Sequence, residues 1–240
     1  MPGKKLTKAM ILAAGYGTRL KPHTDVLPKA LVQYNNKPMI EHVILKLISA
    51  GIEDITVNVH YLPDKIFDYF KANEFDAKIN LTFEPEILGT GGGIKNARNF
   101  LSGSGNFIVH NADVDSGIDI AELFNRHINS DVLATLCVKK RETSRPVLVD
   151  NSNYLCGRIY KGETKLYKET LSYSETSFCG VSVFSDRVFE LFPDTENFDI
   201  ALFLFEMIRN GEKVLCYDIG DTYWKDLGKF EDLNADIPHK

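Results

Sequence analysis

Apolar side chains recur along the first half of the chain in two alternating patterns. Four short apolar runs have the length and residue types of buried strands: residues 10–14, 55–59, 79–83 and 107–109. Three segments between them carry apolar residues at every third or fourth position, which predicts helices: residues 38–51, 64–72 and 91–101. Strands that alternate with helices at this spacing predict a parallel sheet joined by right-handed crossovers.

The second half of the chain is less regular. Three further strands are predicted, at residues 132–138, 178–184 and 214–219. Residues 146–160 predict a hairpin, and an apolar helix at residues 198–209 is expected to end at Gly211. Because no repeat or low-complexity segment interrupts the chain, we expect one α/β domain over residues 1–240. Its sheet is expected to be mixed and mostly parallel, with a small β-hairpin extension.

Composition narrows the class of protein. The 240 residues are 44% hydrophobic and 25% charged, as in an ordinary globular protein. A net charge of −5 argues against nonspecific nucleic-acid binding, and no apolar stretch has the length of a signal-peptide core or a membrane span. Four dispersed cysteines predict free buried thiols and a cytoplasmic location: Cys137, Cys156, Cys179 and Cys216. Aromatic residues near the predicted hairpin leave oligomerisation open.

The clearest chemical signal follows the first predicted strand. A turn containing Gly15 and Gly17 leads to Thr18 and Arg19, and Lys29 comes after a segment with two prolines. Glycines let backbone N–H groups approach an anion closely, and arginine and lysine supply positive charge. This segment is therefore suited to bind a triphosphate.

Two common phosphate-binding motifs do not account for this segment. The dinucleotide-binding fingerprint needs a third glycine where Leu20 stands, and an acidic residue for the ribose that is missing after the second predicted strand. A Walker-type loop needs Gly-Lys followed by Ser or Thr, a tripeptide that does not occur in the chain.

Residues 15–24 match the pattern G-x-G-T-R-L-x-P-x-T, and Pro28-Lys29 follows it. The whole string resembles the sugar-1-phosphate nucleotidyltransferases, also called NDP-sugar pyrophosphorylases. The resemblance implies a Rossmann-like three-layer α/β/α fold, with Arg19 and Lys29 as catalytic cations. It also implies nucleotide contacts from four residues of the turn: Ala13, Gly15, Gly17 and Thr18.

A second motif, EILGTGGGI at residues 86–94, resembles the nucleobase-binding turn of the same family. Its triple glycine is most similar to short N-acetylmuramate-1-phosphate uridylyltransferases, which favours UTP as the nucleotide. The resemblance implies base contacts from Glu86, Gly91 and Gly92. A glycine-rich loop that serves only to start a helix is the alternative interpretation.

Two aspartates stand where the family has its metal ligands. Asp113 ends the segment Asn111-Ala112-Asp113, and Asp226 lies within Trp224-Lys225-Asp226-Leu227-Gly228. Each alone would be an ordinary turn or capping residue. Together and in the expected order, they imply a Mg²⁺ cofactor.

The resemblance implies four sugar contacts: Asn111, Glu163, Lys165 and Gly180. Gly180 belongs to Phe178-Cys179-Gly180, which is similar to the family segment whose glycine lies against the sugar. Glu163-Thr164-Lys165 departs from the family's Glu-Lys-Pro element because it lacks the proline. A plain charged hairpin is therefore an equal interpretation of that segment.

The implied reaction is transfer of a nucleotidyl group from a nucleoside triphosphate, with UTP favoured, to a sugar 1-phosphate. GTP with a mannose or heptose 1-phosphate, or CTP with phosphocholine, are the alternatives within this chemistry. A sugar-nucleotide sensor without catalysis is an alternative of a different class. Because the chain has no hexapeptide repeats, no attached left-handed β-helix acyltransferase domain is expected.

Overall fold

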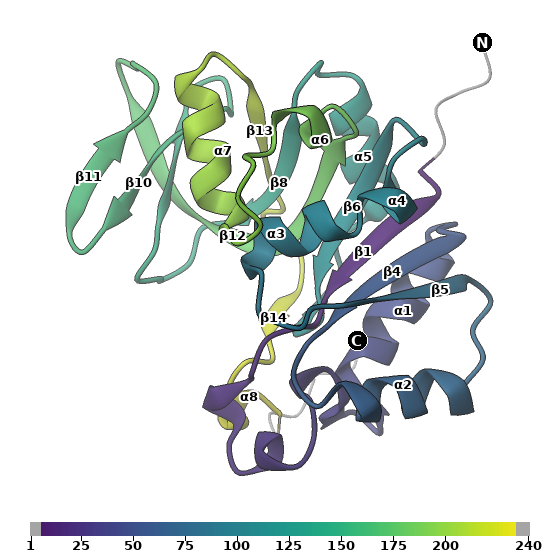
Figure 1. Ribbon diagram of the computed structural model, residues 1–240. Helices are drawn as coiled ribbons and strands as arrows, with labels where there is room; N and C mark the ends of the chain where they lie inside the picture. The colour runs from purple at the N-terminus through teal and green to yellow at the C-terminus, as the bar shows by residue number, and fades with distance from the viewer. Residues whose placement is uncertain (1–5, 234–240) are drawn as a thin grey trace.

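The computed structural model describes residues 6–233, with a ten-stranded sheet at the centre (Figure 1). Four parallel strands form one half of this sheet in the order β5-β4-β1-β6: β1 (Lys8–Leu12), β4 (Asp54–Val59), β5 (Lys78–Phe83) and β6 (Asn106–Asn111). The direction of winding reverses between β1 and β6. Open α/β sheets bind ligands at the carboxyl ends of their strands beside such a reversal.

The other half of the sheet is built around one long strand, β12 (Tyr173–Ser185). Its C-terminal part lies antiparallel to β6 and to β8 (Ala134–Lys139), and β13 (Val214–Asp218) runs parallel to β8. Its N-terminal part pairs with the first of three antiparallel strands: β9 (Val147–Asp150), β10 (Leu155–Tyr160) and β11 (Glu163–Leu166). The predicted hairpin is therefore part of a three-stranded meander that β12 joins to the main sheet.

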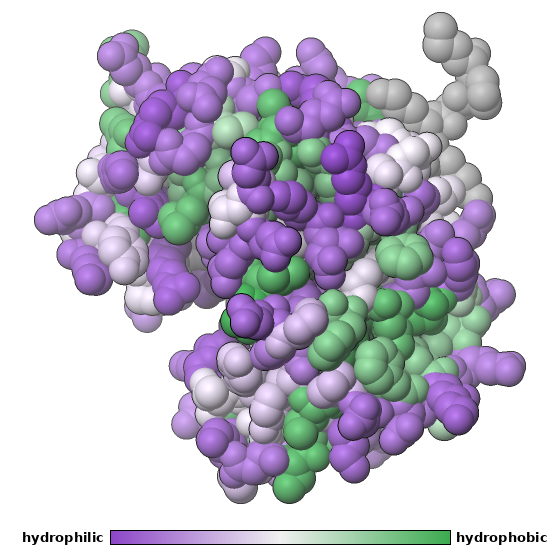
Figure 2. Space-filling view, viewed as in Figure 1, coloured by the Kyte–Doolittle hydropathy of each residue, from purple (hydrophilic) through white to green (hydrophobic). Residues whose placement is uncertain are grey.

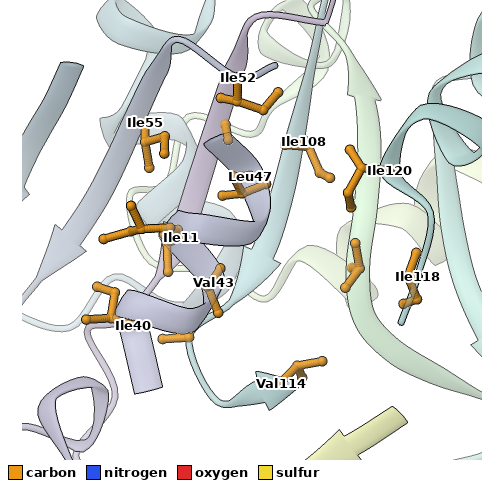
Figure 3. Close-up of a cluster of buried hydrophobic side chains, with 14 of the residues drawn as sticks. Ile11, Ile40, Val43, Leu47, Ile52, Ile55, Ile108, Val114, Ile118 and Ile120 are labelled. Carbon is orange, nitrogen blue, oxygen red and sulfur yellow. The ribbon is translucent and has the colours of Figure 1, made fainter. Parts of the chain in front are cut away.

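Helices cover both faces of the sheet because successive strand residues point into two different apolar cores. Along β1, Ala9 and Ile11 belong to one core and Met10 to the other. Three helices cover the first core: α1 (Met39–Ser49), α2 (Pro63–Ala72) and α5 (Ile120–Ile128). Four helices cover the second: α3 (Gly89–Asn96), α4 (Arg98–Leu101), α6 (Val188–Leu191) and α7 (Ile200–Arg209). Figure 3 shows Val43 and Leu47 of α1 packed against Ile11, so the expected three-layer architecture is confirmed.

The remaining elements are short strands, 3₁₀ turns and one helix near the carboxyl ends of the parallel strands. Two small strand pairs form there, β2 (Gln33–Tyr34) with β3 (Lys37–Pro38), and β7 (Val114–Ser116) with β14 (Trp224–Asp226). Three 3₁₀ turns and a last helix account for the rest: η1 (Thr18–Leu20), η2 (His23–Asp25), η3 (Lys29–Leu31) and α8 (Phe230–Leu233). No helix within residues 6–233 is both long and apolar enough to cross a membrane.

Several elements differ from the sequence prediction, and three of these differences concern the first strand and two helical segments. The first strand ends at Leu12 rather than residue 14, because the Ala13 N–H leaves the sheet and donates to Asn58 Oδ1 at 2.8 Å. The helix predicted at residues 91–101 is two helices, α3 and α4, which meet at Ala97. Helix α5 was not predicted, although Asp119 caps it by accepting a hydrogen bond from the Glu122 N–H at 3.0 Å.

Candidate active site

A cavity of about 230 Å³ opens at the carboxyl ends of β1, β4, β5 and β6, where the order of the sheet reverses. Residues from the glycine turn, the strand ends and the start of α3 line it: Leu12, Ala13, Ala14, Gly15, Lys29, Ala30, Asn58, Glu84, Ile87, Gly89, Thr90, Asn111, Ala112 and Asp113. The cavity therefore gathers Ala13, Gly15, Lys29, Asn111 and Asp113, five of the residues expected from the sequence to contact substrate or metal.

The glycine turn owes its shape to close contact with the Lys29 segment. Gly17 has a φ of +64°, and a Cβ there would lie 2.7 Å from Lys29 Cβ. The Gly17 carbonyl accepts hydrogen bonds from the Leu20 N–H and the Thr24 hydroxyl, each at 2.9 Å. A Cβ on Gly15 would meet no atom within 4 Å, so at this position the backbone is open toward the cavity.

Lys29 and Asp113 form an ion pair on the wall of the cavity, where their side chains are only 16% and 19% exposed. Lys29 starts η3 directly after Pro28, and Asp113 follows the end of β6. The pair puts one cation and one carboxylate side by side where a polyphosphate would enter. Its partial burial makes each charge act more strongly than it would in open water.

Asp226 reaches the same region because β14 lies antiparallel to β7. The Leu227 N–H donates to the Asp113 carbonyl at 2.8 Å, and the Gly228 N–H donates to Asp226 Oδ1 at 2.7 Å. A Cβ on Gly228 would lie 2.5 Å from the Arg19 guanidinium and 2.6 Å from Asp226 Oδ1. The absence of a side chain at Gly228 thus leaves room for the side chains of Arg19 and Asp226.

Strand β7 is held in place by polar contacts from α1 and from both small strand pairs. The Lys46 ammonium donates to the Ser116 carbonyl and, at 3.1 Å, to the Ser116 hydroxyl. Burial lowers the pKa of Lys46. The hydroxyls of Tyr34 and Tyr223 each donate to Asp115 Oδ2 at 3.2 Å. These contacts position the segment that carries Asp113.

A buried carboxylate connects the two loops of the cavity, and the sequence analysis missed it. Glu84 is fully buried; its Oε1 accepts from the Asn58 amide at 2.7 Å and its Oε2 accepts from the Leu88 N–H at 3.0 Å. Asn58 in turn accepts the Ala13 N–H, so the hydrogen bonds run from the glycine turn to the start of α3. Their positions in the sequence could have indicated this role, because Asn58 and Glu84 are polar and stand at the carboxyl ends of predicted parallel strands.

The candidate metal ligands are two carboxylates. Within residues 6–233, no group of three or more His, Cys, Asp and Glu side chains is arranged to hold a metal ion. Mg²⁺ is usually bound by one or two carboxylates, with substrate phosphates and water supplying the remaining oxygens. The β7–β14 pair holds Asp113 and Asp226 close along the backbone, so these two carboxylates would be the protein's share of such a site.

One protein family matches almost the whole of the described chain. The model of the family described as nucleotidyl transferase matches residues 8–238. The chain belongs to the nucleotidyl transferase family. The resemblance read from the motif after the first strand is therefore confirmed.

Curated relatives of this nucleotidyl transferase are longer than the chain. A mannose-1-phosphate guanyltransferase of Yarrowia lipolytica is 32% identical over 233 residues, which are 94% of this chain and 62% of the relative. A UTP–glucose-1-phosphate uridylyltransferase of Synechocystis sp. is 29% identical over 241 residues, which are 94% of this chain and 61% of the relative. The chain thus spans about 62% of the length of these curated relatives.

A solved structure shares the fold along nearly its full length. HddC from Yersinia pseudotuberculosis, crystallised as a complex with GMP-PN, superposes with a TM-score of 0.74 at 24% identity. The match covers 95% of this chain and 96% of HddC. The Rossmann-like fold expected from the sequence is confirmed for this nucleotidyl transferase.

Three residues expected to contact the base lie elsewhere in this nucleotidyl transferase. Glu86 is exposed and does not line the cavity, whereas Glu84 does. A Cβ on Gly91 would lie 2.2 Å from the Phe198 ring, and one on Gly92 would lie 2.0 Å from the Glu196 carbonyl oxygen. Both glycines allow α3 to approach the segment before α7, and neither lines the cavity. Gly89 and Thr90 line it instead.

The four residues expected to contact the sugar divide into two pairs. Gly180, with a φ of +76°, leaves space for the Asn111 side chain, since a Cβ there would lie 2.9 Å from Asn111 Nδ2. Asn111 lines the cavity, whereas Gly180 does not. Glu163 and Lys165 lie on the exposed edge strand β11, and Lys165 lines a second cavity beside α7. Neither of them lines the cavity that contains Lys29.

Proposed function

We propose that this chain transfers a guanylyl group from GTP to a sugar 1-phosphate of the mannose or heptose type, releasing pyrophosphate. The observation that carries the reaction class is an open glycine turn and the Lys29–Asp113 pair at one cavity of a nucleotidyl transferase fold, with Asp226 held near Asp113 by the β7–β14 pair. Sequence reasoning favoured UTP, and the guanine alternative now has better support.

Support for guanine comes from the relatives, whereas the UTP preference rested on the resemblance of the triple glycine. The Yarrowia lipolytica relative is a mannose-1-phosphate guanyltransferase, and HddC was crystallised with a guanine nucleotide analogue. Gly91 and Gly92 pack against residues 196–198, and a Cβ on Gly93 would lie 2.8 Å from Glu84 Oε1. Close packing of α3 is therefore a second reason for these glycines, besides contact with a base.

In the proposed reaction, an oxygen of the sugar 1-phosphate attacks the α-phosphorus of the nucleotide. The new oxygen–phosphorus bond forms as the bond from the α-phosphorus to the β-phosphate bridging oxygen breaks, and pyrophosphate leaves. The nucleophile is already an anion at neutral pH, so no general base is needed. The obstacle is repulsion between two anions that must be held in line.

Lys29 and Arg19 would counter that repulsion with positive charge. Lys29 lies in the cavity wall and would neutralise charge near the reacting phosphate, while Arg19, beside Gly228, would hold the departing pyrophosphate. Asp113 and Asp226 would hold Mg²⁺. When bound, this ion would supply positive charge to the phosphate oxygens.

The experiment that tests this proposal measures pyrophosphate release with Mg²⁺, for GTP, UTP, CTP, ATP and dTTP against a panel of sugar 1-phosphates. We expect GTP with mannose or heptose 1-phosphate to give the highest turnover. Faster turnover with UTP would overturn the base assignment. Nucleotide binding without turnover on any sugar would favour the alternative of a sensor.

Variants connect the activity to the named residues. We expect Arg19→Ala and Asp113→Ala to lower turnover by about 10²–10³-fold, because each removes a charge placed at the reacting phosphates. Both should keep their far-ultraviolet circular dichroism spectrum. Lys21→Ala is the matched control, since Lys21 is an exposed cation in the same segment that pairs with Asp25 at 3.0 Å. Normal turnover in either test variant would refute the assigned role.

A further inference from the structure

A second cavity lies between α7 and the β10–β11 hairpin, and its volume of about 490 Å³ exceeds that of the candidate active site. Small-molecule sites in proteins typically occupy roughly 300–1,000 Å³. Arg158 and Lys165 reach the cavity from the hairpin, and Leu202 and Glu206 reach it from α7. None of the four belongs to the site proposed for nucleotidyl transfer.

The cations of this cavity lack acidic partners, whereas its acids are already engaged. Among the ion pairs within residues 6–233, none includes Arg158 or Lys165. Arg158 Nε is buried, and no described residue accepts a hydrogen bond from it. Asp199 accepts from the Leu202 N–H at 3.0 Å, and Glu206 pairs with Arg209. With Arg209 included, three cations (Arg158, Lys165 and Arg209) stand against the two carboxylates, so the net charge around the cavity is positive.

The remaining wall is apolar and aromatic. Phe198, Phe203 and Tyr167 line it, and the Arg158 guanidinium lies 5.4 Å from the centre of the Phe205 ring. Leu202 is 46% exposed although it stands on this wall, and Figure 2 shows apolar surface between the hairpin and α7. A ligand that binds both the cations and the apolar residues carries a negative charge at one end and a flat apolar body at the other.

We propose that this second cavity binds a small aromatic anion. Its anionic group would accept hydrogen bonds from Arg158 and Lys165, and its ring would cover Leu202 and Phe198. Such a ligand could be a nucleotide or a simple aromatic phosphate, carboxylate or sulfonate, because all share this chemistry.

Hydrogen bonds connect the second cavity to the candidate active site. Phe198, which lines the second cavity, accepts hydrogen bonds at its carbonyl from the N–H groups of Gly91 at 2.9 Å and Gly92 at 3.3 Å. The Ile200 N–H, at the start of α7, donates to the hydroxyl of Thr90, which lines the active-site cavity. A ligand in the second cavity would therefore stabilise the first turn of α3. Binding at the second cavity does not depend on the proposed function; only the consequence of this link for nucleotide use rests on it.

The test uses anilinonaphthalene sulfonate, an aromatic anion whose fluorescence rises in apolar surroundings. We expect saturable binding of one probe per chain, and about tenfold weaker binding in each of Arg158→Met and Lys165→Met, since each loses a charged hydrogen bond. Leu202→Trp should block the probe by filling the cavity from an exposed position. Lys161→Met is the control, because Lys161 is an exposed cation of the same hairpin that does not line the cavity.

Unchanged probe binding in both Arg158→Met and Lys165→Met would overturn the proposal, as would an equal loss in Lys161→Met. Competition in a Lys29→Met background separates the ligand sources, because its candidate active site is impaired. Displacement by GMP there would identify a nucleotide, and displacement by phenyl phosphate alone would identify a smaller aromatic anion. Hydrogen exchange tests the link: bound probe should slow exchange at Gly91, Gly92 and Ile200, and unchanged exchange would refute it.

Discussion

At the scale of one residue, a substitution at Gly15 is expected to affect substrate binding much more than stability. We predict that Gly15→Ala changes the free energy of unfolding by less than about 0.5 kcal/mol, because its Cβ would meet no atom within 4 Å. The same methyl group would project where a phosphate approaches the backbone, so KM for the nucleotide should rise roughly tenfold, the value of one hydrogen bond. Urea unfolding and steady-state kinetics measure the two effects.

Gly17→Ala is the informative contrast, since a Cβ there meets Lys29 Cβ at 2.7 Å and φ is +64°. This variant should lose stability as well as activity. An unchanged KM in Gly15→Ala would contradict close approach of the nucleotide to the turn.

Glu84 is expected to stabilise the protein through the two hydrogen bonds that its carboxylate accepts. A carboxylate accepts both the Asn58 amide and the Leu88 N–H, whereas the amide in Glu84→Gln must present its own donor to one of them. We predict a loss of about 1–3 kcal/mol in the free energy of unfolding, and a higher KM for the nucleotide. Glu86→Gln is the control, because Glu86 is exposed two residues further on. Equal stability of the two variants would show that the buried network does not matter.

At the scale of elements, helices α5 and α7 begin with the same cap but have different neighbours. Asp119 and Asp199 each accept a hydrogen bond from the N–H three residues ahead, at 3.0 Å. We predict that Asp119→Ala and Asp199→Ala each lower the free energy of unfolding by about 1 kcal/mol. Only Asp199→Ala should also raise KM for the nucleotide, because the next residue, Ile200, donates to Thr90 in the cavity wall. Urea titrations and nucleotide kinetics on both variants test the comparison, and matching KM values would contradict it.

At the scale of the whole molecule, stability should depend on pH through His110 in the central strand β6. Burial lowers the pKa of His110 to about 4, from an ordinary value of 6.5. Above pH 6.5 the side chain is neutral in both states and its contribution is fully present. As the pH falls from 6.5 to about 4, only the unfolded chain takes up the proton. The free energy of unfolding should therefore fall by about 3 kcal/mol across this range.

Urea titrations between pH 7 and pH 4 measure this loss, and His110→Gln supplies the comparison. The variant is expected to have a flatter pH profile over the same range, whatever its absolute stability. An identical slope in the two proteins would assign the pH dependence to other groups.

Local patterns determined most elements and much of the site. The 3.6-residue spacing of apolar residues was enough to predict α1 and α7 to within two residues at each end, since both bury one continuous face. The string from Gly15 to Lys29 was enough to predict that the glycine turn and Lys29 belong to one site, and both line the cavity. The buried state of Cys137, Cys156, Cys179 and Cys216 was also predicted correctly.

Contacts between distant segments decided the rest. Nothing near Asp226 in the sequence indicates that β14 pairs with β7, and this pairing alone brings Asp226 beside Asp113. The roles of Glu84 and Asn58 depend on two parallel strands ending at one edge of the sheet. The triple glycine suggested a base contact, yet Gly91 and Gly92 meet a segment about a hundred residues away. The sequence by itself determined which residue types could bind phosphate and metal, because that chemistry belongs to individual side chains. Only the tertiary structure decided which of them share a cavity, because that depends on strand order and long-range pairing.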